Sequence, residues 1–135
     1  MYQMPSSDSR PALIPNFEKS DGLVPVITQD CSSGDVLMLG WMNLAAWNAT
    51  LERRKAVYWS RTHQKLWEKG AISGRSQLVK EILLDCDLDA ILLKVDQLGD
   101  AACHTGHRSC FYRRVTKNSV EIVAKPLFNP EDVYD

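Results

Sequence analysis

The sequence lacks the features of membrane, secreted and nucleic-acid-binding proteins. No apolar run approaches the roughly 20 residues that a transmembrane helix needs. Residues 1–20 have no apolar core like that of a secretory signal. With a formal net charge of −1, the chain has no general attraction to nucleic acid or to anionic lipid. We therefore expect a cytoplasmic protein with no nucleic-acid partner and no membrane association.

The four cysteines lack the pattern of a disulfide framework or a redox motif. In a reducing compartment such cysteines are metal ligands or inert core thiols more often than disulfides. No CxxC is present, which argues against a thiol-transfer protein and against a zinc ribbon. Their uneven spacing favours metal ligands.

No internal repeat or low-complexity tract is present, and 135 residues suffice for one hydrophobic core but are short for two. We predict a single compact domain at 22–125. Residues 1–21 contain three prolines among small polar residues and have no helical or strand period, so they are expected to form a loosely ordered tail. A C-terminal tail is expected at 126–135.

The apolar pattern predicts an α+β fold, predominantly antiparallel β with one clear helix. Asn43 can cap a helix at 44–54, in which apolar residues recur at helical spacing. Pro25 favours an edge position for its strand. The run 82–84 lacks the alternation of apolar and polar residues. It therefore fits either a strand buried on both faces or a helix. Strands are expected at 23–27, 36–41, 56–60, 66–70, 77–85, 90–96, 111–115 and 120–124.

Three of the cysteines, Cys86, Cys103 and Cys110, lie in one short stretch near the C-terminal end. Thiolates suit zinc, and three protein ligands leave the fourth tetrahedral position for water, as in catalytic zinc sites. Such a water ionises near neutral pH and becomes a nucleophile. Buried or incidental thiols are an equally good interpretation of the spacing alone.

Asp85, Asp87 and Asp89 surround Cys86 in the sequence. On an extended segment, alternate residues project to one side, so the three carboxylates would face away from Cys86. Crowded carboxylates repel one another unless a cation neutralises them, and oxygen ligands suit Mg²⁺. The pattern predicts a magnesium site if the segment is extended, and a solvated acidic turn is the alternative.

The histidines and the aromatic residues supply further candidates. His104 follows Cys103 directly and is the preferred acid/base group, whereas His107 is about as often a solvent-facing loop residue. No role is assigned to His107, to His63 in a polar turn, or to Cys31. A set of aromatic and basic residues could stack a heterocycle and hold phosphates, or could equally fill a core and meet solvent: Trp59, Arg61, Trp67 and Lys69.

Together these segments resemble the phosphoribosyl-AMP cyclohydrolase family. The resemblance covers roughly 22–114 and rests on W-S-R at 59–61, L-W-E-K-G at 66–70, D-C-D-L-D at 85–89 and C-H-T-G continuing to S-C-F-Y-R at 103–113. Thr62-His63, Ile72 and Gly40-Trp41 depart from the residues that are common in the family.

The resemblance implies a ligand set and an assembly. It implies that Cys86, Cys103 and Cys110 bind zinc and that Asp85, Asp87 and Asp89 bind magnesium. Members of the family are homodimers in which one subunit supplies the first cysteine and the other supplies the later pair. An intimate homodimer with a shared zinc site is therefore implied, with 22–125 as the cyclohydrolase domain.

The activity implied is the third step of histidine biosynthesis. Zinc-activated water opens the adenine ring of phosphoribosyl-AMP between N1 and C6, and His104 relays a proton. The short stretch after Arg114 suggests a monofunctional enzyme. A zinc-stapled nucleotide- or RNA-binding module without catalysis, with Cys31 as a fourth ligand, is the alternative. Candidate phosphate contacts are Arg61, Lys69, Arg75, Arg108 and Arg113.

Overall fold

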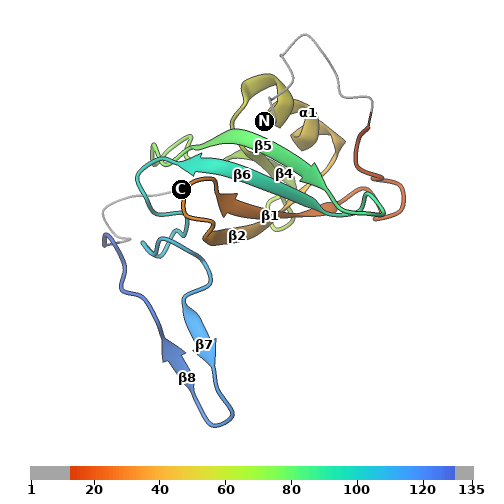
Figure 1. The fold of residues 1–135 in the computed structure, drawn as a ribbon. Coiled ribbons are helices and arrows are strands. Elements are labelled where there is room, and N and C mark those ends of the chain that lie inside the picture. The colour runs from red at the N-terminus through yellow and green to blue at the C-terminus, as the bar shows by residue number, and fades with distance from the viewer. Residues whose placement is uncertain (1–12, 130–135) are drawn as a thin grey trace.

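Four strands form the main sheet, in the order β2-β1-β6-β5 (Figure 1). In this computed structural model, which describes residues 13–129, they are β1 (Val24–Asp30), β2 (Val36–Met42), β5 (Gln77–Leu84) and β6 (Ile91–Gln97). β1–β2 and β5–β6 are antiparallel pairs, whereas β1 and β6 run parallel. The predicted fold class is confirmed, since one compact domain contains mostly antiparallel strands and one helix.

Two details of the strand predictions are wrong. Pro25 does not lie at an edge, because β1 is between β2 and β6. Pairing with β6 begins only at Val26, so the missing N–H of Pro25 lies outside that register. β5 is not buried on both faces. It is an edge strand with a bulge between Val79 and Glu81, and Leu83 is 38 % exposed.

One face of the sheet is covered by the helix and by a second hairpin. The helix, α1 (Leu44–Arg53), begins as predicted at Asn43, whose Oδ1 accepts a hydrogen bond from the Ala46 N–H at 2.9 Å. It ends at Arg54, whose φ of 57° stops the helical path. Trp47 and Leu51 lie in the core, where burial of a leucine stabilises the fold by about 2 kcal/mol.

The second hairpin pairs β3 (Val57–Ser60) with β4 (Lys65–Glu68). Tyr58 of β3 packs against Gly40 of β2, where a Cβ would meet the tyrosine ring at 2.6 Å. Glycine at position 40 therefore lets β3 approach the sheet closely. None of the helices in the described part of the chain is long and apolar enough to cross a membrane.

A line of buried polar side chains crosses the core from β1 to β6. The Tyr58 hydroxyl lies 2.7 Å from Thr28 Oγ1 and donates to Gln77 Oε1 at 2.6 Å. Gln77 Nε2 donates to Gln97 Oε1 at 2.8 Å, and Gln97 Nε2 donates to the carbonyl oxygen of Arg75 at 3.1 Å. Because each of these groups has a hydrogen-bond partner within the protein, they avoid the cost of unsatisfied burial.

The other face of the sheet has an apolar row that none of residues 13–129 covers. The row crosses all four strands, because Leu39 pairs with Ile27, Ile27 with Leu92, and Leu92 with Leu83. Ile27 and Leu39 are 40 % and 47 % exposed. Surfaces of this kind typically mark interaction sites.

The last hairpin, β7 (Arg113–Val115) and β8 (Val120–Ile122), extends away from the sheet (Figure 1). All six of its strand residues are exposed, and Val115, Val120 and Ile122 share one face of the hairpin. A two-stranded hairpin has marginal stability in water on its own. Another surface that covers the apolar face of this arm would therefore stabilise it.

Candidate metal and substrate site

The turn between β5 and β6 brings three carboxylates together. One oxygen of each of Asp85, Asp87 and Asp89 lies within 4.8 Å of the others, and these residues are called the carboxylate cluster below. The cluster forms through a tight turn, in which Leu88 has a φ of 65° and Asp85 Oδ1 accepts from the Asp89 N–H at 2.9 Å. The two-sided arrangement, with the aspartates facing away from Cys86, was expected only if the segment is extended; that condition is not met, because residues 86–88 turn.

Lys19 supplies positive charge to the carboxylate cluster. Its Nζ lies 2.8 Å from Asp87 Oδ2 and 3.3 Å from Asp89 Oδ2. The hydrogen bond from Lys19 lowers the pKa of Asp87 to about 2, whereas the neighbouring Asp87 raises the pKa of Asp89. Three oxygen donors on an exposed turn match the chemistry of a hard divalent cation.

Cys103 and Cys110, called the thiol pair below, lie close to each other at the end of the sheet opposite the carboxylate cluster. Cys103 is buried, and its Sγ lies 2.9 Å from Thr105 Oγ1. Cys110 donates its backbone N–H to the carbonyl oxygen of Leu37 at 2.7 Å. Desolvation of the thiol and then the nearby Cys103 raise the pKa of Cys110 to about 12. Two adjacent soft donors suit zinc.

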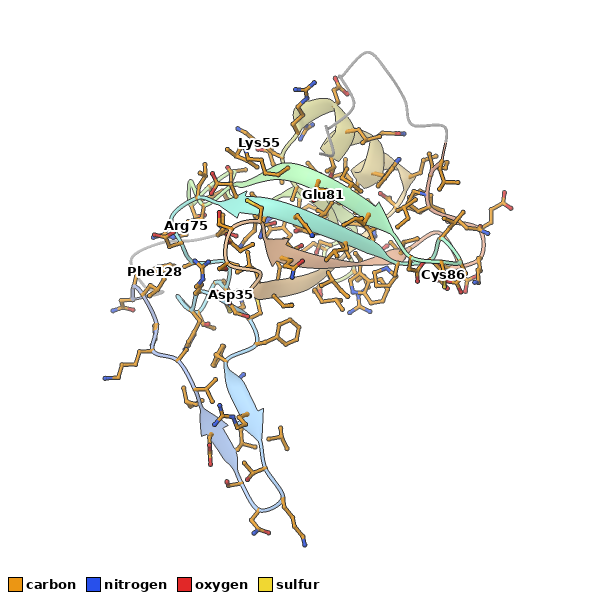
Figure 2. All side chains as sticks on the ribbon, in the orientation of Figure 1. Asp35, Lys55, Arg75, Glu81, Cys86 and Phe128 are labelled. Carbon is orange, nitrogen blue, oxygen red and sulfur yellow. The ribbon has the colours of Figure 1, made fainter. Side chains whose placement is uncertain are left out.

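Cys86 lies too far along the sheet to join the thiol pair within one chain. It is exposed in the β5–β6 turn, at the opposite end of the sheet from Asp35 (Figure 2). Seven residues of β6 separate the two ends, which is about 23 Å at the rise of a strand. Within residues 13–129 the carboxylate cluster is the one group of three His, Cys, Asp or Glu side chains with converging ligand atoms. Cys31 therefore does not complete a ligand set with the thiol pair there.

Hydrogen bonds and ion pairs connect the thiol loop, residues 103–110, to the turn between β1 and β2. Arg108 Nε donates to Asp35 Oδ2 at 3.1 Å, and its Nη2 lies 3.6 Å from Asp30 Oδ2. The pKa of Asp30 is lowered, chiefly by the backbone N–H of Ser33 and also by Arg108. Ser109 Oγ donates to the carbonyl oxygen of Val36 at 2.7 Å. Arg108, a predicted phosphate contact, thus makes ion pairs within the chain.

The two histidines of the thiol loop have different surroundings. His107 is buried and stacks on Tyr112 with ring centroids 3.6 Å apart, so a solvent-facing His107 is excluded. Its Nδ1 lies 2.8 Å from Thr105 Oγ1, which links it to Cys103. His104, the candidate acid/base group, is exposed next to the buried thiol of Cys103.

Aromatic and basic groups gather on the β3–β4 hairpin beside the thiol pair. Trp67 lies 5.6 Å from Tyr58, and Lys69 Nζ lies 5.2 Å from the Trp67 ring. Lys69 is only 3 % exposed, and its charge reaches Cys110, whose pKa it lowers slightly against the larger effects of burial. A buried ammonium in this position favours negative charge on the neighbouring thiol.

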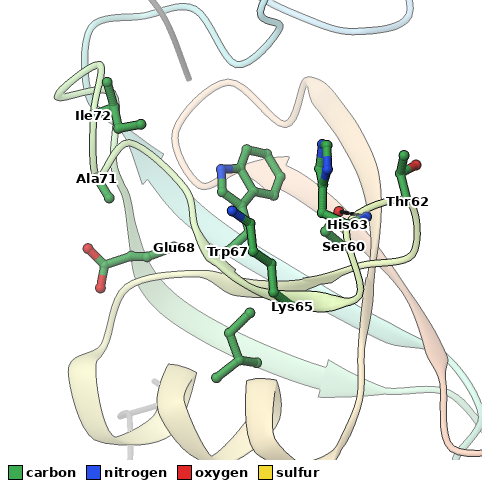
Figure 3. Close-up of a pocket in the computed structure, with 9 residues that line it drawn as sticks. Ser60, Thr62, His63, Lys65, Trp67, Glu68, Ala71 and Ile72 are labelled. Carbon is green, nitrogen blue, oxygen red and sulfur yellow. Dashed lines mark hydrogen bonds between the residues drawn. The ribbon is translucent and has the colours of Figure 1, made fainter.

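The same hairpin forms a hollow of about 560 Å³, called the hairpin hollow below (Figure 3). Trp67 lines it, as do His63, Lys65 and Ile72. Trp67 was a candidate from its residue type, whereas Lys65 was not, although the two lie two residues apart on one strand and therefore share a face.

The remaining predicted substrate residues are not among those that line the hairpin hollow. The Arg61 guanidinium lies 4.4 Å from the ring of Trp41. Arg75 lies 3.9 Å from the Phe128 ring, and its buried Nε has no hydrogen-bond partner in the described part of the chain. Arg113 lies 4.5 Å from the ring of Tyr112, at the start of the protruding arm. Trp59 is half-buried on β3.

Comparison with known proteins finds a family model and relatives that share one description. The sequence model of the family described as phosphoribosyl-AMP cyclohydrolase matches residues 38–112. The phosphoribosyl-AMP cyclohydrolase of Desulfotalea psychrophila is 56 % identical over 88 % of this chain and 94 % of its own length. That of Oleidesulfovibrio alaskensis is 49 % identical over 92 % and 95 %, and that of Ruthia magnifica is 52 % identical over 84 % and 90 %.

Proposed function

The chain belongs to the phosphoribosyl-AMP cyclohydrolase family, and we propose that it opens the adenine ring of phosphoribosyl-AMP between N1 and C6 in histidine biosynthesis. One observation carries the proposal beyond family membership. The thiol pair, a zinc-type donor set, adjoins the buried Lys69, which lies 5.2 Å from the Trp67 ring of the hairpin hollow. Metal donors and a surface for a heterocycle are thus neighbours.

The reaction adds water to C6, breaks the C6–N1 bond and transfers a proton to N1, which leaves a carboxamide on the imidazole ring. C6 is electrophilic because it is an amidine-like carbon. Trp67 would stack on the ring system and hold it in place. His104 is exposed beside Cys103 and would deliver the proton to N1 as the bond breaks.

Zinc would be held by the thiol pair together with Cys86 of a second copy of the chain. When bound, the ion supplies a water molecule whose pKa is lowered to near neutrality. Two features of the chain support sharing between copies: the distance of Cys86 from the thiol pair, and the exposed apolar surfaces of the sheet and the arm. We therefore propose a homodimer.

We propose that the carboxylate cluster binds Mg²⁺. The bound ion would take the place of the Lys19 ammonium beside the carboxylates. A magnesium ion there would orient the phosphates of the substrate, because Mg²⁺ commonly keeps waters and bridges carboxylates to phosphate. The substrate is a phosphorylated intermediate of amino-acid biosynthesis, and we propose the cytoplasm as the place of the reaction.

The direct test is turnover with and without metal. Purified protein is incubated with phosphoribosyl-AMP, and the imidazole carboxamide product is followed by chromatography. We expect product formation that stops in a zinc chelator and returns when zinc is added. Turnover without metal would refute the zinc dependence, and absence of product with zinc present would refute the function.

Two cysteine variants sharpen this test. Cys103→Ser removes one member of the thiol pair and should abolish both zinc binding and turnover. Cys31→Ser is the matched control, because Cys31 is an exposed cysteine outside the proposed ligand set, and it should retain zinc and activity. Loss of zinc in Cys31→Ser would instead favour a closed four-sulfur site.

A further inference from the structure

The turn that borders the hairpin hollow is held by its own hydrogen bonds. Ser60 Oγ accepts from the His63 N–H at 3.1 Å, and the Ser60 carbonyl oxygen accepts from the Gln64 N–H at 2.8 Å. Gln64 Nε2 donates to the carbonyl oxygen of Arg61 at 2.6 Å. A turn that is already ordered can present its side chains to a ligand at a low entropic cost.

Three side chains of the hairpin point to the same side of it. His63, Lys65 and Trp67 project together, and Ile72 faces them from the segment after β4 (Figure 3). Ile72 is 77 % exposed, although it lies at the rim of a hollow next to an indole ring. A ligand that enters between Trp67 and Ile72 would remove apolar surface from water on both sides.

Lys65 is the one side chain with a full positive charge among the described residues that line the hollow. Among the described residues that line it, Glu68 is the one acid, and Arg53 Nη1 lies 3.2 Å from Glu68 Oε1. Arg53 comes from α1, outside the hollow, so it offsets the charge of Glu68 without occupying the space. The charge of Lys65 and the hydrogen-bonding capacity of His63 therefore remain available to an anionic ligand.

We propose that the hairpin hollow binds the phosphoribosyl group next to the ring that stacks on Trp67, with Lys65 and His63 holding the phosphate and Ile72 covering the pentose beside Trp67. Its volume of about 560 Å³ is in the range of small-molecule sites and admits a sugar phosphate. This inference rests on the proposed function. It assigns substrate affinity to two residues outside both metal-donor sets.

The kinetic test compares Lys65→Gln and His63→Asn with Lys80→Gln. Lys80 is a matched control, because it is an exposed lysine on β5, outside the hollow. We expect KM for phosphoribosyl-AMP to rise about tenfold in Lys65→Gln, the size of one lost charge-assisted hydrogen bond, with kcat within about twofold. Lys80→Gln should leave both constants unchanged. A wild-type KM in Lys65→Gln and His63→Asn, with turnover intact, would overturn this inference but leave the function standing.

A binding test works without turnover and so separates the two proposals. Ribose 5-phosphate is titrated into the wild-type protein and the variants, and tryptophan fluorescence is recorded. We expect a quench that is absent with ribose, absent in Trp67→Phe, and about tenfold weaker in affinity in Lys65→Gln. Equal affinity of the wild type and Lys65→Gln for ribose 5-phosphate would overturn the inference, whether or not the enzyme turns over its substrate.

Discussion

At the scale of single residues, neighbouring charges decide the protonation state of a side chain. Asp87 and Asp89 are two residues apart on one turn, yet the pKa of Asp87 is lowered and that of Asp89 is raised. The difference arises because Lys19 donates most directly to Asp87, and the resulting carboxylate then opposes ionisation of its neighbour. One lysine thus sets the charge of the carboxylate cluster.

Lys19→Met should raise the pKa of Asp87 from about 2 toward its ordinary value, because the charged donor is lost. Carboxyl NMR titration measures this shift directly. A pKa lowered in the folded state gives stability that is present above about pH 4 and is lost as the pH falls toward 2. The variant should therefore lose less stability than the wild type across that window. An unchanged Asp87 titration would contradict the assignment to Lys19.

His104→Ala should lower kcat by about 10²–10⁴-fold, the usual size of a lost proton transfer, while zinc content stays at the wild-type level. Turnover assays and metal analysis of the same preparation check both parts. Because His104 is exposed, its removal leaves no cavity in the core. Full turnover of His104→Ala would show that another group delivers the proton.

At the scale of elements, the buried polar line joins strands that are distant in the sequence. Tyr58, Gln77 and Gln97 belong to β3, β5 and β6, and their hydrogen bonds connect the hairpin with the central sheet. Burial raises the pKa of Tyr58 well above its usual value, so its hydroxyl remains protonated and can donate to Gln77. These hydrogen bonds help to hold β3, and with it the hairpin hollow, next to β2.

Gln77→Leu should lower the free energy of unfolding by about 1–3 kcal/mol, because it leaves the buried hydroxyl of Tyr58 and the side chain of Gln97 each with one partner fewer. Urea unfolding followed by circular dichroism measures the change. Glu52→Gln, an exposed substitution on α1, is the control and should fall within about 0.5 kcal/mol of the wild type. A neutral Gln77→Leu would show that the polar line adds no net stability.

At the scale of the whole molecule, the proposed zinc ligands lie at opposite ends of one sheet. Cys86 follows β5, whereas the thiol pair lies beyond the far end of β6. A second copy in a two-fold arrangement can bring one end of its sheet against the other end of the first copy, which yields two identical sites. The apolar row on the sheet and the arm formed by β7 and β8 are the surfaces available for such contact.

Mixing two inactive variants tests this arrangement. Cys86→Ser and Cys103→Ser should each be inactive alone, but a mixed dimer contains one complete site made of Cys86 from one copy and the thiol pair from the other. Co-expression in equal amounts should therefore restore about a quarter of wild-type turnover, since half of the dimers are mixed and each has one of two sites. Native mass spectrometry verifies that mixed dimers form. Mixed dimers without activity would show that the site is not shared.

Much of the secondary structure could be predicted from the sequence, because its signals are local. The cap at Asn43, the apolar spacing of α1 and the polar turns between hairpin strands each depend on neighbours within a few residues. The positions of the four hairpins and the helix are confirmed on this basis. The candidate residues of the carboxylate cluster and the thiol pair were also identified from residue type alone.

Only the tertiary structure decided which of these residues meet. The parallel pairing of β1 with β6, the position of β5 at the sheet edge and the burial of His107 against Tyr112 depend on contacts between distant segments. Donor type is a property of a residue and can be read from the chain, but convergence in space depends on strand order and register. For that reason the sequence by itself determined the chemistry available to this protein. The fold decided that Cys86 and the thiol pair are held apart within one chain, and that Lys65 joins Trp67 in one hollow.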